Sequence, residues 1–103
     1  MPETDPSVRV VDNPDRNRYE AYVQDSLAGF VTYRTRPGVV TLVHTEVDRA
    51  FEGHGVGGRL AAGALEDARA RGVQVEPLCP FIVTYLRRHP EFADLVLGSR
   101  PAN

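Results

Sequence analysis

Phe51-Glu52-Gly53-His54-Gly55-Val56-Gly57-Gly58-Arg59-Leu60 is the most informative stretch of this sequence, because four glycines fall within the six positions 53–58. It lies between an apolar run, residues 39–47, and a helical pattern, residues 56–71. A glycine-rich turn from a strand into a helix leaves backbone N–H groups unpaired, and the helix dipole adds positive potential there. The stretch therefore predicts a phosphate or pyrophosphate site. The alternative is a loop that leads into a helix and binds nothing.

The length and composition indicate one globular domain. A chain of 103 residues can bury one modest core, and its 42% hydrophobic and 25% charged residues are ordinary values. No apolar run approaches the length of a membrane span, and the acidic, proline-containing start is unlike a signal peptide. We therefore expect a cytoplasmic protein with no membrane partner. The net charge of −2 argues against a nucleic-acid partner.

The single cysteine, Cys79, excludes an internal disulfide framework. Cys79 and the three histidines, at positions 44, 54 and 89, are scattered and lack the spacing of metal ligands. The sequence therefore predicts no metal site.

Four strands joined by short turns are predicted before the glycines, after a loose start at residues 1–7. They cover residues 8–11, 19–24, 27–35 and 39–47. In the second run Tyr19, Ala21 and Val23 alternate with polar neighbours, which is typical of a half-buried strand. The last run is apolar on both faces at its start, so we expect it to be central. This pattern predicts an antiparallel meander.

The period changes to that of a helix over residues 56–71, with Gly72 expected at its end and Asp67 and Arg71 paired one turn apart. Residues 73–78 are predicted as a fifth strand, reached by a right-handed parallel crossover. Pro77 cannot donate to a strand ladder, so the fifth strand should separate from its neighbour near this residue.

A second helix is predicted after the fifth strand, with Cys79 at its N-cap, Pro80 at its first position and Pro90 at its end. Its expected buried residues are Phe81, Ile82, Tyr85 and Leu86. Residues 92–97 are predicted as a last short strand. The predicted fold class is α+β: a mixed, mostly antiparallel sheet with one β-α-β crossover, a C-terminal helix, and splayed fourth and fifth strands.

These features resemble the GNAT superfamily of acyl-CoA-dependent N-acetyltransferases. The family motif, Gln/Arg-x-x-Gly-x-Gly/Ala, lies between a central strand and a helix, and Glu52-Gly53-His54-Gly55-Val56-Gly57 occupies it here. Glu52 stands where the family has Gln or Arg. The run from His44-Thr45-Glu46-Val47 to Pro77-Leu78-Cys79 is similar to a short branch that lacks the N-terminal helices. The resemblance implies that residues 1–103 form a single truncated GNAT-like domain.

The resemblance also implies that acetyl-CoA is bound as the acyl donor. The pyrophosphate would lie on the N–H groups of residues 53–57, and the pantetheine arm between the fourth and fifth strands. Its amides would pair with the edge of the fourth strand, and its thioester would lie beside Cys79. The residues expected at this site are Glu46, Val47, Glu52, Gly53, His54, Gly55, Val56, Gly57, Gly58 and Arg59. For Arg59 a solvated helix face is the alternative.

Four residues are candidates for catalysis. Cys79, at a helix N-cap where the dipole favours thiolate, is either a nucleophile for the acetyl group, a polar contact to CoA, or a small apolar filler. His44 and Glu46 share one strand face, and either could deprotonate an ammonium group; otherwise they are exposed rim residues. Tyr85 could protonate the leaving thiolate, although its place on the apolar stripe fits core packing equally well.

The sequence thus predicts an N-acetyltransferase that moves an acetyl group to a primary amine of an unidentified acceptor, directly or through Cys79. The alternative is a non-catalytic acetyl-CoA-binding or protein-interaction module of the same fold. Gly53, Gly55 and Gly58 also match a dinucleotide-binding fingerprint, but an antiparallel meander before them is the wrong context. We expect a monomer or a weak homodimer.

Overall fold

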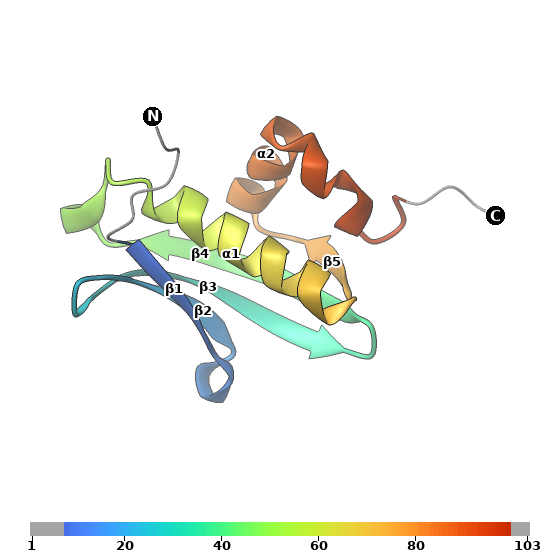
Figure 1. The fold of residues 1–103 in the computed structure, drawn as a ribbon, viewed down its shortest axis with the longest axis horizontal. Helices are drawn as coiled ribbons and strands as arrows, with labels where there is room; N and C mark the ends of the chain where they lie inside the picture. Colours follow the sequence, from blue (N-terminus) through green and yellow to red (C-terminus); the bar gives the residue numbers. More distant parts are fainter. Residues whose placement is uncertain (1–7, 100–103) are drawn as a thin grey trace.

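A single five-stranded sheet forms the framework of the molecule. The structure is a computed structural model that describes residues 8–99; the predicted loose start, residues 1–7, lies outside the described residues. The strands, in both chain and sheet order, are β1 (Val8–Asn13), β2 (Arg18–Val23), β3 (Ser26–Arg36), β4 (Val39–Val47) and β5 (Gln74–Pro77). The first four pair antiparallel, and β5 pairs parallel to β4, which confirms the predicted meander, crossover and fold class (Figure 1).

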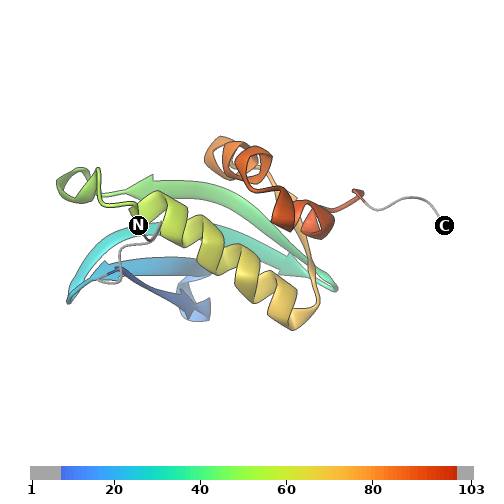
Figure 2. The ribbon, with the colours of Figure 1, turned by 45° about the horizontal axis from the view of Figure 1, so that its top comes forward.

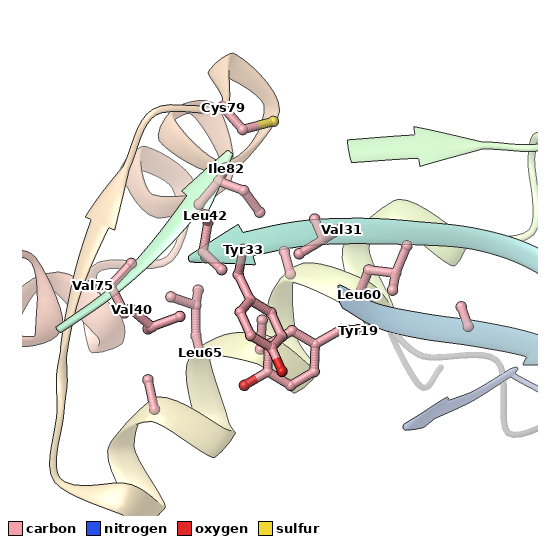
Figure 3. Close-up of a cluster of buried hydrophobic side chains, with 14 of the residues drawn as sticks. Tyr19, Val31, Tyr33, Val40, Leu42, Leu60, Leu65, Val75, Cys79 and Ile82 are labelled. Carbon is pink, nitrogen blue, oxygen red and sulfur yellow. The ribbon is translucent and has the colours of Figure 1, made fainter. Parts of the chain in front are cut away.

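Helix α1 (Val56–Arg71) runs across one face of the sheet (Figures 1 and 2). Its apolar stripe is buried against the strands, where Leu60 and Leu65 meet Val31 and Leu42 in the core (Figure 3). As predicted, Gly72 ends the helix with a φ of 72°, a conformation that costs glycine little. The predicted Asp67–Arg71 ion pair is present at 2.9 Å.

Helix α2 (Pro80–Arg88) follows β5 at once, with Cys79 at the N-cap and Pro80 at the first position, as predicted. The predicted buried face is only partly right. Ile82 is fully buried, whereas Phe81 is 42% exposed. The Phe81 ring does not enter the core because it lies against the first turn of α1, a neighbour that helical periodicity alone does not reveal.

The prediction of a last strand at residues 92–97 is wrong. The segment is a 3-10 helix, η3 (Pro90–Leu95), and only Val96 makes an isolated bridge, to Val75 of β5. Phe92 and Leu95 are both buried, and their three-residue spacing puts them on the same side of a 3-10 helix. In the sequence, these two residues and the apolar residues beside them look like a short strand.

Strand β2 is more deeply buried than its alternating pattern predicts. Tyr19 and Ala21 face the core, but Glu20, on the opposite side, is also only 4% exposed. Its carboxylate accepts hydrogen bonds from Arg18, Asn13 and Tyr22. These long polar neighbours cover the carboxylate, and their donors compensate for its removal from water.

Candidate functional site

Strands β4 and β5 are paired over only part of β4. The parallel register runs from Val39 with Gln74 to Leu42 with Pro77. The N–H groups of Leu78 and Cys79 then both donate to the Leu42 carbonyl, at 3.0 and 3.2 Å. Beyond this point β4 continues to Val47 paired with β3 alone. The predicted separation near Pro77 is confirmed, and residues 43–47 present an edge that β5 does not cover.

The glycine-rich loop joins this uncovered end of β4 to α1. It starts with a short 3-10 helix, η2 (Arg49–Phe51), whose N-cap Asp48 accepts the Ala50 N–H at 2.8 Å. Gly53 and Gly55 then take positive φ values of 87° and 74°, and a Cβ at either position would meet only open space. Both glycines are therefore required by the backbone conformation, and the space beside them is open to a ligand.

The backbone N–H groups of this loop are largely available. Within residues 8–99, the N–H groups of Gly53 and of residues 55–58 donate no backbone hydrogen bond, as expected at a helix start. That of His54 is an exception, because it closes a turn onto the Phe51 carbonyl at 3.3 Å. The remaining donors, at the positive end of the α1 dipole, suit a phosphate or pyrophosphate group.

The first turn of α1 is flanked by two aromatic residues of α2. A Cβ placed on Gly57 would lie 2.8 Å from Cζ of Phe81, and one on Gly58 would lie 4.0 Å from the Tyr85 ring. Glycine at position 57 thus allows the Phe81 ring to approach the helix backbone. Phe81 was not singled out from the sequence as a site residue, although its position two residues after Cys79 places it at the same helix end.

Cys79 is 3% exposed, and its thiol lies 3.2 Å from the Thr45 hydroxyl of β4. Burial alone would raise the pKa of Cys79, but hydrogen bonding to Thr45 and to the N–H groups of Ile82 and Phe81 holds it below its ordinary value. The thiolate is therefore stabilised at the N-terminus of α2. The sequence analysis did not single out Thr45. A sign of its role in the sequence is its position between two polar site candidates, which face the other side of the strand.

His44 and Glu46 lie next to each other on the exposed face of β4. His44 Nε2 and Glu46 Oε2 are 2.9 Å apart, and both side chains are more than half exposed. Side chains alternate along a strand, so this pair projects from the face opposite to Thr45 and Cys79. The structure thus brings the two candidate bases together but does not place them beside the thiol.

Tyr85 packs among the rings of the C-terminal region. Its ring stacks on that of His89, with centroids 3.9 Å apart, and lies 6.4 Å from that of Phe92. This arrangement supports the packing interpretation of Tyr85. Its role as an acid stays a prediction.

Arg59 turns toward β1. Its Nη2 donates to the Val8 carbonyl at 3.4 Å, and its Nε is buried without a partner among the described residues. The side chain is therefore half-buried against β1 and does not lie on a solvated helix face. Glu52 and His54 are exposed on the loop, and Val47 is half-buried at the end of β4. Contacts of these residues with a ligand stay predictions.

Residues 8–99 hold no group of three or more His, Cys, Asp or Glu side chains suited to a metal ion. No helix in the same range is both long and apolar enough to cross a membrane.

Comparison with protein families identifies the group to which this molecule belongs. Residues 18–95, which include β4, the glycine-rich loop and Cys79, match the family described as GCN5-related N-acetyl-transferase. The chain belongs to this family. The match supports an acetyltransferase.

Two solved structures have a fold similar to that of this chain. The solution structure of a GCN5-like protein from Staphylococcus aureus matches with a TM-score of 0.67 and 22% identity, over 91% of this chain and 92% of that one. The crystal structure of Ard1 from Thermoplasma volcanium matches with a TM-score of 0.52 and 22% identity, over 59% and 43% of the two chains. Comparison with curated proteins gave no match.

Proposed function

We propose that this GCN5-related protein is an acetyl-CoA-dependent N-acetyltransferase that acts on a primary amine. One observation carries the proposal: the open glycine-rich loop, with its available N–H groups, leads directly from the uncovered end of β4, where the Cys79 thiol also lies. These three features follow one another along the molecule. The anion site suits the pyrophosphate of an acyl-CoA molecule, the free strand edge suits its pantetheine arm, and the polar group at the end suits its thioester.

The residues that would hold acetyl-CoA follow from this arrangement. The N–H groups of Gly53 and of residues 55–58 would donate to the pyrophosphate. The backbone of β4 near Glu46 and Val47 would pair with the pantetheine amides. Bound there, acetyl-CoA supplies an activated acetyl group, and this family membership is the reason to expect it.

Direct transfer is the first of two routes that the residues support. The acceptor must lose a proton before its nitrogen attacks, and the His44–Glu46 pair offers a base on the exposed face of β4. The carboxylate 2.9 Å from the imidazole would orient that ring. In this route Cys79 acts only as a polar contact.

The second route uses Cys79 as a nucleophile. Its thiolate would attack the acetyl carbonyl, so that a C–S bond to Cys79 forms while the C–S bond to CoA breaks and CoA is released as its thiolate. The amine would then take the acetyl group, giving its proton to a base and regenerating the Cys79 thiolate. The lowered pKa of Cys79 favours this route, whereas its 3% exposure favours the first.

Intact-mass analysis after incubation with acetyl-CoA distinguishes the routes. The chain has no lysine, so side-chain amines do not compete for the acetyl group. One acetyl adduct that is lost in Cys79→Ser supports the nucleophile. No adduct, together with release of the CoA thiol when an acceptor amine is present, supports direct transfer. Calorimetry with CoA and acetyl-CoA tests the underlying proposal, which absence of binding to both would overturn.

The buried position of Cys79, on the opposite face from the candidate base pair, also favours a second candidate function, a module that binds acetyl-CoA without turnover. Thiol release measured with polyamines, amino acids and basic peptides separates the two. Tight binding without release across this panel would support the module.

A further inference from the structure

A surface pocket lies on the face of the sheet opposite to α1, beside the candidate base pair. Its volume is about 450 Å³, and its polar lining is Arg16, Asn17, Thr32, Arg34 and Thr35. Thr32 and Arg34 alternate along β3 with the core residues Val31 and Tyr33, so their side chains project away from α1. Thr32 stands directly opposite His44 in the β3–β4 register. The pocket therefore borders His44.

The pairing of β3 with β4 is irregular at this pocket. The register shifts between Thr32 and Tyr33, so that Val43 of β4 has no partner on β3, and Val43 also lines the pocket. An extra residue of this kind bends its strand and re-aims the side chains beside it, and it is frequent next to active sites. The irregularity places the pocket next to the end of β4 that β5 leaves uncovered.

Two arginines supply the charge of the pocket. Within residues 8–99, neither Arg16 nor Arg34 forms an ion pair or a hydrogen bond through its side chain, and no Asp or Glu lines the pocket. Arg18, by contrast, is bound to Glu20 at 2.7 Å. Like charges that line one pocket repel each other, and an anion between them relieves this repulsion. The unpaired guanidiniums therefore favour an anionic group, and their forked donors suit a carboxylate.

The opposite charge lies at the other end of the same face. Glu46 follows His44 along β4 on the side away from Arg34, and its side chain is 60% exposed. An ammonium group is attracted to this end of the face, and a carboxylate to the arginine end. His44, between the two, is a diagonal neighbour of Arg34 across the strand pair, and such neighbours lie roughly 7–8 Å apart.

We propose that the acceptor is a primary amine that also carries a carboxylate, separated from the nitrogen by about two residues of extended chain. This inference rests on the proposed function and on its direct route, in which the His44–Glu46 pair accepts the amine proton. The amine would lie beside that pair, and the carboxylate beside Arg34 and Arg16. A dipeptide has these dimensions, because an extended chain spans about 3.3–3.6 Å per residue.

Amide chemical shifts of the full chain, titrated with glycylglycine without acetyl-CoA, test the pocket itself. We expect saturable shifts at Thr32, Arg34 and Val43. Glycylglycinamide keeps the amine and the length but lacks the carboxylate, so it should bind at least about tenfold more weakly, the usual effect of losing a charged hydrogen bond. Equal affinities for the two compounds, shifts that never saturate, or saturable shifts confined to other parts of the chain would each overturn the proposal.

The variant Arg34→Gln removes one guanidinium of the pocket without changing the core. We expect it to weaken glycylglycine binding about tenfold and to leave glycylglycinamide binding unchanged. Arg36→Gln is the matched control, because Arg36 lies on the same strand and is exposed, but it is paired with Glu76 at 3.3 Å and does not line the pocket. Equal affinities for wild type and Arg34→Gln, or equal weakening in both variants, would contradict the assignment.

Release of the CoA thiol, measured with each dipeptide as acceptor, separates this inference from the proposed function. We expect faster release with glycylglycine than with glycylglycinamide, and loss of that preference in Arg34→Gln. Equal release with both dipeptides would overturn the inference and leave the proposed function standing. Selective binding of glycylglycine by a protein that neither binds acetyl-CoA nor releases thiol would support the carboxylate pocket and overturn the proposed function.

Discussion

At the scale of single residues, hydrogen-bonding groups of β4 and of α2 hold the pKa of the Cys79 thiol below its ordinary value. The hydroxyl and the backbone of Thr45 belong to β4, and the backbones of Phe81 and Ile82 belong to the helix that Cys79 caps. Only the first of these is a side chain, so only Thr45 can be removed without disturbing the helix. Thr45 therefore acts on Cys79 as a positioning residue.

Thr45→Val is expected to raise the pKa of Cys79, because it removes a hydrogen bond that favours the thiolate while leaving the thiol buried. The ultraviolet absorbance of the thiolate, followed against pH, should show its midpoint at higher pH than in the wild type. Thr84→Val is the control, since Thr84 is an exposed residue of α2. An unchanged midpoint in Thr45→Val would contradict the role of this hydroxyl.

The glycine-rich loop allows a test of its charge preference at Gly53. Asn and Asp tolerate positive φ better than most residues and have nearly the same shape, so Gly53→Asn and Gly53→Asp differ mainly by one negative charge. If the loop binds pyrophosphate, Gly53→Asp should bind CoA at least about tenfold more weakly than Gly53→Asn, because like charges repel strongly near a protein surface. Calorimetry measures both affinities, and equal affinities would argue against an anion site here.

At the scale of elements, the contact between α1 and α2 depends on one missing side chain. Gly57 and Gly58 are neighbours in the first turn of α1, but only at Gly57 would a Cβ press on an aromatic ring. Alanine normally stabilises a helix by up to about 1 kcal/mol relative to glycine. The Phe81 ring should remove that gain in stability at position 57 and leave it at position 58.

We therefore expect Gly58→Ala to raise the free energy of unfolding by about 0.5–1 kcal/mol, and Gly57→Ala to bring no such gain. When Phe81→Ala has removed the ring, Gly57→Ala should become stabilising by a similar amount. Urea unfolding of the single and double variants measures this coupling. Additive effects of Gly57→Ala and Phe81→Ala would show that the two helices do not meet as described.

At the scale of the whole molecule, buried charge makes stability depend on pH. Burial raises the pKa of Glu20, but the hydrogen bonds from Arg18, Tyr22 and Asn13 outweigh this and hold it below its ordinary value. A carboxylate whose pKa is lowered in the folded state stabilises the protein above its unfolded pKa, and this contribution is lost as the pH falls through the folded pKa.

Glu20→Gln should accordingly be less stable than the wild type at neutral pH, because it also leaves Arg18 without its partner. The difference in melting temperature should shrink as the pH falls below the ordinary carboxyl range. Thermal unfolding of both proteins over a pH series measures this. A difference that stays constant down to acid pH would assign the effect to packing instead of charge.

The sequence predicted those parts of the molecule that depend on local pattern. The meander, the α1 boundaries, the cap at Cys79 and the parting at Pro77 follow from periodicity, glycine and proline, and the structure contains all of them. The orientation of Phe81, the burial of Glu20 and the 3-10 helix at Pro90–Leu95 depend on partners distant in the chain or on weak local preference, which a single sequence does not reveal. Thr45 was missed for the same reason, since its contact crosses from one element to another.

The uncovered edge of β4 also bears on how the protein should be handled. Bare strand edges are templates on which other chains add, and they are a recognised source of aggregation. Here the edge at residues 43–47, which β5 does not cover, belongs to an interior strand of the sheet order. If CoA binds along that edge as proposed, purification with CoA present should prolong solubility, because the bound molecule would block the growth of intermolecular sheets.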